Sequence, residues 1–242
     1  MIIIPARLSS SRLPNKVLAD INGIPMVIRT ALTAQKVDKV VIATDSEKVI
    51  KVAQKYNIDS VLTDINHKSG TDRIKEATDI LKLDNKELII NLQGDEPFIE
   101  KEILIEMKKT LETIQNREFV MASCYKIIDE ISAEDPNLVK VVIDNNSDAI
   151  YFSRSKIPYN RDNSVHKYKG HIGIYGFNKK SLDKFCEISA KIEDIEKLEQ
   201  LRVIYHGYKI KMVEVKTESF GIDTIEDLEK AKRVFENEKN SN

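Results

Sequence analysis

Cysteine is scarce in this sequence: the 242 residues include only Cys124 and Cys186, and neither stands in a CxxC pair. This scarcity argues against a thiolate metal site and against a small scaffold held together by disulfides. We therefore expect two buried, reduced thiols rather than a disulfide, in a protein of the cytoplasm.

Neither sign of charge predominates, since 38 basic and 39 acidic side chains leave a formal net charge of −1. The chain thus lacks the broad positive field that attracts nucleic acids or anionic membranes, and any phosphate site must be local. No apolar run approaches the roughly 20 residues that a membrane-spanning helix requires. The first residues already have the character of a core strand, so we expect no secretory or transit leader. We expect neither a nucleic-acid partner nor a membrane partner.

Glycine is also rare, with eight in the chain, and the first is Gly23. The stretch after the first apolar run therefore holds neither a Walker A motif nor the GxGxxG fingerprint, which counts against a P-loop and against a dinucleotide-dependent dehydrogenase. The histidines His67, His166 and His206 share no metal-ligand spacing, and we find no serine–histidine–aspartate arrangement. Any phosphate bound here must be held mainly by side chains.

What the sequence does contain is a regular alternation of short apolar runs and amphipathic stretches. Four apolar runs in the first half predict strands, at Ile2–Pro5, Val40–Thr44, Ser60–Thr63 and Leu88–Leu92. Helical spacing follows each of them, in 25–36, after a Ser46 cap, in 71–83 and in 100–111. This order is typical of an α/β fold in which helices cover both faces of a mainly parallel central sheet.

The second half of the chain has a different pattern, which predicts a mixed sheet or a β-rich insert. Its predicted strands are 119–127, 139–143, 149–153, 172–177 and 209–215, and its predicted helices are 182–188, 195–204 and 224–238. The polar stretch 160–169 is typical of a mobile loop, and Thr224 with Asp227 forms a capping box for the last helix. There is no repeat or low-complexity linker, so we expect a single domain over 1–242 with an insert roughly within 119–177.

The loop directly after the first strand carries Arg7, Arg12, Lys16 and three consecutive serines. Open α/β sheets bind their ligands in the crevice beyond the carboxyl ends of the strands. Arginine forks match phosphate oxygens in pairs, and a lysine adds a compact positive charge. The loop therefore predicts a polyanion site, although a solvated basic loop explains the same residues without a ligand.

Two aspartates follow apolar runs and glycines, Asp95 in LQGDEP and Asp223 in FGIDT. A carboxylate beyond a buried strand can hold a hard cation, and Mg²⁺ usually takes one or two protein carboxylates together with water and phosphate oxygens. Each aspartate could instead cap the turn that follows it. Together with the cationic loop, the two carboxylates compose a site for a metal and a triphosphate.

Other polar side chains in the second half interrupt apolar surroundings. Arg154 lies in FSRSKIP, between a predicted strand and a proline, so its backbone is well defined and it could fork a carboxylate. His171, Tyr175 and the pair Glu199–Gln200 are suited to binding the hydroxyl groups of a sugar. A structural histidine and a solvated helix face are the alternatives for these last residues.

Seven motifs, which span nearly the whole chain in one order, resemble those of the 3-deoxy-manno-octulosonate cytidylyltransferases. The motifs are IPARLSSSRLPNK, HKSGTDR, NLQGDEP, FSRSKIP, HIGIYGF, LEQLR and GIDTIEDL. The more distant CMP-sialic acid synthetases share mainly the first of them. The resemblance implies a Rossmann-like nucleotidyltransferase fold, a homodimer, and transfer of CMP from CTP to 3-deoxy-D-manno-octulosonate (Kdo) with Mg²⁺ and release of pyrophosphate, for lipopolysaccharide synthesis.

The resemblance also implies roles for individual residues. The triphosphate would be held by Arg7, Ser10, Arg12 and Lys16, with Arg12 and Lys16 stabilising the leaving group. The cytosine and ribose would be surrounded by Ser69, Gly70, Thr71 and Arg73. Mg²⁺ would be bound by Asp95 and Asp223, which together with Arg12 and Lys16 would form the catalytic set. Kdo would be surrounded by Gln93, Arg154, His171, Tyr175, Glu199 and Gln200, and the insert would contribute to sugar binding and to the dimer.

The sequence departs from the family pattern in two places. The stretch from Pro158 to His171 is short, and Asn15 replaces a glycine that is common before the lysine. An amino-substituted Kdo or another 2-keto sugar acid is an alternative substrate. A nucleotide-binding regulatory module without catalysis is the alternative from another functional class.

Overall fold

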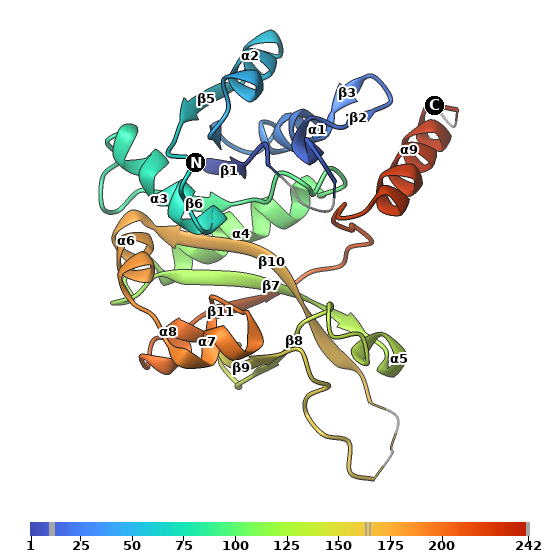
Figure 1. Ribbon diagram of the computed structural model, residues 1–242. Coiled ribbons are helices and arrows are strands. Elements are labelled where there is room, and N and C mark those ends of the chain that lie inside the picture. The colour runs from blue at the N-terminus through green and yellow to red at the C-terminus, as the bar shows by residue number, and fades with distance from the viewer. Residues whose placement is uncertain (10–12, 163, 165, 241–242) are drawn as a thin grey trace. The chain divides into compact units, whose positions relative to one another are not determined.

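The computed structural model describes residues 1–9, 13–162, 164 and 166–240 (Figure 1). The chain forms two compact units, each built from segments that are distant in sequence. The first unit comprises 1–83, 91–104 and 218–242, and the second comprises 84–90 and 105–217. The strand β6 (Leu88–Asn91) and the helix α4 (Lys101–Ile114) belong partly to each unit.

The first unit contains a parallel sheet in the order β1 (Ile2–Ala6), β4 (Val40–Thr44) and β5 (Asp59–Leu62). Every residue of β1 and β4 is buried, as expected for continuous apolar runs in a parallel sheet. The register pairs Ile2 with Val40 and Ala6 with Thr44, so the residues that follow β1 and β4 leave the sheet at the same edge. That edge carries the candidate site of this unit.

The helices of the first unit are α1 (Met26–Ala34), α2 (Glu47–Lys55), α3 (Gly70–Ile80) and α9 (Ile225–Asn240), and a short 3₁₀ turn spans Lys16–Leu18. Helices α2, α3 and α9 begin at side-chain caps, whereas α1 follows Pro25 without one. The Ser46 hydroxyl accepts the Lys48 amide at 3.2 Å, so the predicted cap of α2 is confirmed. The predicted capping box of α9 is also confirmed, since Thr224 and Asp227 each accept the other's amide, at 3.2 and 3.0 Å.

A small hairpin that the sequence analysis missed joins the 3₁₀ turn to α1. Its strands are β2 (Asp20–Ile21) and β3 (Ile24–Pro25), and they pair antiparallel around Asn22 and Gly23. Both turn residues have positive φ, +50° and +85°. An Asn-Gly pair is the residue choice that such a two-residue hairpin turn favours, because both positions require left-handed backbone.

The second unit is organised around the long strand β7 (Met121–Ile128). Strand β11 (Lys211–Glu214) pairs with β7 in parallel and β10 (Tyr168–Asn178) pairs with it antiparallel, as Figure 1 shows. Strand β8 (Lys140–Ile143) pairs with β10 and forms a hairpin with β9 (Ala149–Ser153), and both lie where the sequence predicts strands. Four short helices complete the unit: α5 (Glu130–Ala133), α6 (Lys179–Glu187), α7 (Lys191–Glu196) and α8 (Leu201–Tyr205).

The predicted α/β class with a mainly parallel sheet is confirmed, but several local predictions are wrong. The single helix expected over 195–204 is two short helices, because Lys197 adopts left-handed backbone at φ +54° and ends α7. Asp223 does not follow a strand, since 215–223 has no regular secondary structure. Strand β10 begins at Tyr168, so it includes the end of the expected loop 160–169. The division into one domain and an insert stays a prediction.

Both cysteines are free thiols, as expected. Cys124 is buried and burial raises the pKa of its thiol to about 12, whereas Cys186 is only half-buried, contrary to the prediction. Among the described residues, no helix has the length and apolar character needed to cross a membrane.

Candidate functional site

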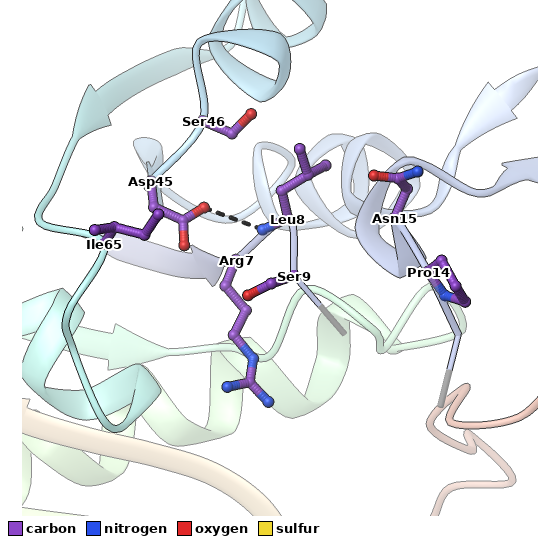
Figure 2. Close-up of a pocket in the computed structure, with 8 residues that line it drawn as sticks. All are labelled: Arg7, Leu8, Ser9, Pro14, Asn15, Asp45, Ser46 and Ile65. Atoms are coloured by element: carbon purple, nitrogen blue, oxygen red, sulfur yellow. Dashed lines mark hydrogen bonds between the residues drawn. The ribbon is translucent and has the colours of Figure 1, made fainter. Parts of the chain in front are cut away.

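The loop after β1 opens into a cavity of about 710 Å³ in the first unit. Its lining is drawn in Figure 2 and consists of Arg7, Leu8, Ser9, Pro14, Asn15, Asp45, Ser46 and Ile65. Arg7 is exposed, so its guanidinium is available to a ligand. Ser10 and Arg12, which were predicted to bind the triphosphate, lie outside the described residues.

Asp45 holds this loop in place, and the sequence analysis missed it. One carboxylate oxygen accepts the Leu8 amide at 3.0 Å, as Figure 2 shows. The other accepts the Arg73 guanidinium at 3.0 Å. Both side chains of the ion pair are buried, with 3% of Arg73 and 5% of Asp45 exposed. Asp45 directly follows a buried strand, which is the same signal that drew attention to Asp95.

The Lys16 ammonium lies between the two predicted metal ligands. Its nitrogen is 2.5 Å from Asp95 Oδ2 and 2.7 Å from Asp223 Oδ1. The lysine is placed by the 3₁₀ turn, which Asn15 initiates in left-handed backbone at φ +55°. Asparagine tolerates that conformation better than most residues, which explains how it can occupy this position.

Contacts between two distant segments bring the two aspartates together. The Ile222 amide donates to the Asp95 carbonyl at 3.0 Å. The Ser219 hydroxyl donates to the Glu96 carboxylate at 3.2 Å. The rings of Phe98 and Phe220 stack with centroids 4.7 Å apart. Each contact joins the segment after β6 to the segment before α9, so the pair of carboxylates is a product of tertiary packing.

The charges of this cluster decide what it can bind. Burial by itself lowers the pKa of Lys16, but the Coulombic and hydrogen-bonding contributions of Asp95 and Asp223 more than offset it, so the pKa is raised and the ammonium stays charged. The described contacts thus place one charged ammonium against the carboxylates of Asp95 and Asp223.

The donor set fits Mg²⁺, since both groups are hard carboxylates and both converge on the one ammonium nitrogen. No cluster of three or more metal-binding side chains occurs in the described part of the chain. Mg²⁺ seldom needs one, because it completes its shell with water and substrate phosphates.

The residues predicted to surround the cytosine and ribose lie at the start of α3, and their contacts are largely structural. The Ser69 hydroxyl caps the helix by accepting the Asp72 amide at 3.1 Å. A Cβ at Gly70 would lie 3.1 Å from Pro5 Cγ, so a larger residue would press on β1. Thr71 is buried, as is Arg73, which orients Asp45. Their contact with a nucleotide stays a prediction.

Gln93 precedes the turn that carries Asp95. Its amide nitrogen donates to Asn91 Oδ1 at 3.0 Å, while Asn91 Nδ2 is buried with no hydrogen-bond partner among the described residues. Of the six residues predicted to surround Kdo, Gln93 belongs to the first unit and the other five to the second.

In the second unit, His171 and Tyr175 share one face of β10, with ring centroids 5.6 Å apart. Burial lowers the pKa of His171 to about 3, so the imidazole is neutral at physiological pH. Burial and then the Glu199 carboxylate raise the pKa of Tyr175, so its phenol keeps its proton. The pair therefore offers neutral hydrogen-bonding groups rather than charge.

Gln200 joins this pair from the start of α8. Its Oε1 accepts the Tyr175 hydroxyl at 3.2 Å. The side chain is only 2% exposed, and its Nε2 finds no hydrogen-bond partner among the described residues. A buried amide without a partner is costly, so this donor marks a place that a ligand acceptor can fill.

The Arg154 guanidinium is held by three carbonyl oxygens. It donates to Glu196 at 2.7 Å, to Pro136 at 3.0 Å and to Lys197 at 3.4 Å. The Glu196 carboxylate instead accepts the Arg154 backbone amide at 3.0 Å. Carbonyls are neutral, so they orient the guanidinium without cancelling its charge.

The structure thus brings together two groups of predicted residues, each within its own unit. Lys16, Asp95 and Asp223 meet in the first, and His171, Tyr175 and Gln200 meet in the second. Besides Asp45, the sequence analysis missed Ser123, whose hydroxyl lies 2.8 Å from His171 Nε2. A polar residue inside the apolar run VMASCY was its only signal in the sequence.

Comparison with known proteins gives a consistent result. A model of the family described as cytidylyltransferase matches residues 1–212. A 3-deoxy-manno-octulosonate cytidylyltransferase of a Nitratiruptor species is 54% identical, over 97% of this chain and 99% of the relative. The enzyme of that name from Helicobacter pylori is 52% identical, over 97% of each chain.

A solved structure supports the same relationship. It is a CMP:2-keto-3-deoxy-manno-octonic acid synthetase complexed with CTP, and it is 36% identical to this chain. The two superpose with a TM-score of 0.92 over 98% of each.

Proposed function

Because this chain belongs to the 3-deoxy-manno-octulosonate cytidylyltransferase family, we propose that it transfers CMP from CTP to Kdo and releases pyrophosphate. The product would be CMP-Kdo, the activated sugar for lipopolysaccharide synthesis. The observation that carries the proposal is the cluster of Lys16, Asp95 and Asp223. Its two carboxylates are suited to bind a metal ion, and its ammonium is suited to bind a phosphate.

The reaction joins two anions, so charge must be neutralised before phosphorus can be attacked. The anomeric hydroxyl of Kdo would attack the α-phosphorus of CTP, the bond to the β-phosphate oxygen would break, and the hydroxyl proton would leave to solvent. Negative charge then develops on the pyrophosphate. Arg7, Arg12 and Lys16 would bind and stabilise it, because fixed cations act best where charge develops.

Mg²⁺ would be held by Asp95 and Asp223, and when bound it would supply positive charge to the phosphate and sugar oxygens. Lys16 is also held by those carboxylates in this structure, and its ammonium would add a further positive charge for a phosphate oxygen. Ser10, Ser69, Gly70, Thr71 and Arg73 complete the proposed nucleotide site.

Kdo would be recognised by neutral groups together with one cation and one carboxylate. His171, Tyr175 and Gln200 offer hydrogen bonds to hydroxyl groups, and the partnerless Gln200 Nε2 favours a ligand there. The charge of Arg154 suits the sugar carboxylate. Glu199 and Gln93 complete the proposed set. A homodimer in the cytoplasm, as the family resemblance implies, is part of the same proposal.

A pyrophosphate-release assay tests the function directly. The protein is incubated with CTP, Mg²⁺ and either Kdo, 8-amino-Kdo or sialic acid, and the nucleotide sugar is identified by mass spectrometry. We expect release with Kdo and its loss when EDTA removes the metal. Turnover with another sugar acid alone would change the substrate, and CTP binding without pyrophosphate release would indicate a regulatory module.

A further inference from the structure

The strands β7 and β10 leave regular register beside His171. His171 pairs with Tyr125 and Ile172 pairs with Cys124. Ser123, which precedes Cys124 on the antiparallel strand β7, pairs with Tyr175 rather than with Gly173. Gly173 and Ile174 are therefore extra residues on β10. This bulge turns the carbonyls of Ile172 and Ile174 toward the Ser123 hydroxyl, at 3.3 and 2.9 Å.

The Ser123 hydroxyl has one proton and three neighbours. It lies 2.8 Å from His171 Nε2 and 2.9 Å from the Ile174 carbonyl, and Ser123 is fully buried. A carbonyl oxygen can only accept, so both contacts are hydrogen bonds only when the hydroxyl proton is directed to the Ile174 carbonyl. The short contact to Nε2 is then a hydrogen bond only if Nε2 carries a proton and donates it to Ser123 Oγ.

The remaining ring nitrogen follows from this arrangement. His171 is neutral, so a proton on Nε2 leaves Nδ1 with a lone pair, and no described residue donates to it. The ring is also held by an edge-on contact with Phe152, with centroids 5.0 Å apart. It is only half-buried, unlike Ser123. Nδ1 is thus a fixed acceptor.

We propose that Ser123 is a positioning residue that locks His171 as the Nε2-protonated tautomer, so that Nδ1 accepts a hydrogen bond from a donor on the sugar substrate. The proposal rests on the proposed function for the identity of that sugar. In this tautomer, His171 Nδ1 accepts a hydrogen bond from a hydroxyl or an ammonium group of the substrate. It repels a carboxylate oxygen at the same place. A substrate with the wrong group at this place is disfavoured because it leaves Nδ1 without a hydrogen-bond donor.

The first test is spectroscopic and needs no substrate. Ring nitrogen shifts of ¹⁵N-histidine-labelled protein report which nitrogen is protonated, and His171→Gln assigns the signal. We expect His171 to be protonated on Nε2 in the wild type and to become a mixture of tautomers in Ser123→Ala. Protonation on Nδ1 in the wild type, or an unchanged tautomer in Ser123→Ala, would overturn the proposal.

The second test is kinetic and uses a matched control. Ser123→Ala should raise the KM for Kdo about tenfold, which is the loss of one hydrogen bond, and leave the KM for CTP within about twofold. Ser123→Thr keeps the hydroxyl and should restore the tautomer and the KM. Ser181→Ala removes another buried hydroxyl, which accepts the Val120 amide at 2.8 Å, and should leave the KM for Kdo unchanged.

The two hypotheses fail in different ways. If the wild type turns over no sugar acid, the proposed function fails, and the ring nitrogen shifts still decide the tautomer. If the wild type is active but Ser123→Ala keeps its KM for Kdo, the positioning role fails and the proposed function stands.

Discussion

The candidate site residues of the two units differ in the charge of the groups that they contact. In the first unit, formal charges contact each other directly: Lys16 lies between Asp95 and Asp223, and Arg73 pairs with Asp45. In the second unit, by contrast, the side chains of His171, Tyr175 and Arg154 hydrogen-bond to neutral groups, although the set also includes the Glu199 carboxylate. The Ser123 hydroxyl orients His171, and Gln200 Oε1 accepts the Tyr175 hydroxyl. Three backbone carbonyls accept the Arg154 guanidinium.

The difference matches the chemistry that each unit would perform. In the first unit carboxylates lie against the Lys16 ammonium, whereas in the second unit the Arg154 guanidinium donates to backbone carbonyls. Lys16 and Arg154 are both cations, yet their partners prepare them for different tasks. Hydroxyl recognition needs a fixed arrangement of donors and acceptors, and uncharged side chains supply it without attracting counterions.

Removing one charge from the first cluster should have the largest effect. Asp95→Asn leaves the shape of the side chain but removes a carboxylate that lies 2.5 Å from Lys16. We expect turnover to fall about 10²- to 10³-fold, the usual cost of removing one electrostatic contact from a transition state. Pyrophosphate release measured over a Mg²⁺ titration would show it. The control is Asp59→Asn, which removes the carboxylate of an exposed ion pair with Lys39 and should behave as wild type. Near-normal turnover in Asp95→Asn would contradict the proposed role of Asp95 as a metal ligand.

Breaking the buried ion pair between Asp45 and Arg73 tests whether the first unit also depends on paired charges for its stability. Asp45→Asn can still accept the Leu8 amide but leaves the 3%-exposed Arg73 without its carboxylate partner, so the free energy of unfolding should fall by about 3 kcal/mol. The KM for CTP should rise as well, because Arg73 no longer orients the side chain that accepts the Leu8 amide.

Asp148→Asn is the matched control, since it removes a buried carboxylate from Arg117 in the second unit. Urea unfolding of both variants should show a loss of stability, but only Asp45→Asn should change the KM for CTP. Equal effects on that KM would show that Asp45 has no special link to the nucleotide.

The neutrality of His171 predicts a dependence of stability on pH. The pKa of His171 is about 3 in the folded protein and about 6.5 in the unfolded chain. Between these two pH values the unfolded chain binds a proton at this histidine and the folded protein does not. Stability from this group is complete above pH 6.5 and is lost as the pH falls toward 3, by at most about 1.4 kcal/mol per pH unit. Urea unfolding between pH 7 and pH 5 should show a steeper loss for the wild type than for His171→Gln. Parallel curves would mean that the imidazole titrates normally.

The smallest effect is expected from the hydrogen bond between Tyr175 and Gln200. Tyr175→Phe removes the donor to Gln200 Oε1, and we expect the KM for Kdo to rise about fivefold, consistent with roughly 1 kcal/mol for one hydrogen bond. Tyr208→Phe is a suitable control, because Tyr208 stacks on Phe119 elsewhere in the same unit. A KM for Kdo that Tyr175→Phe leaves unchanged would show that this side chain does not orient Gln200 for the sugar.

Local signals explain why much of the fold could be predicted. The buried runs IIIPA and VVIAT predict parallel strands, and Ser46 and Thr224 cap the helices where expected, because these preferences depend on a few neighbouring residues. The prediction failed where one backbone angle overrode the periodicity, as at Lys197, or where a short hairpin had too few residues for a pattern.

The type of chemistry could be read from the chain alone, since the chain supplies strand-end carboxylates, a cationic loop and neutral polar groups in an apolar second half. The pairing of these groups depends on tertiary packing. Lys16 meets an aspartate 207 residues away, and Ser123 meets a histidine 48 residues away. Such contacts depend on which segments pack together and on a two-residue bulge in β10, and neither leaves a local signal. That is why Arg7, Lys16 and Asp95 could be singled out from the chain, whereas the roles of Asp45 and Ser123 became visible only in the folded protein.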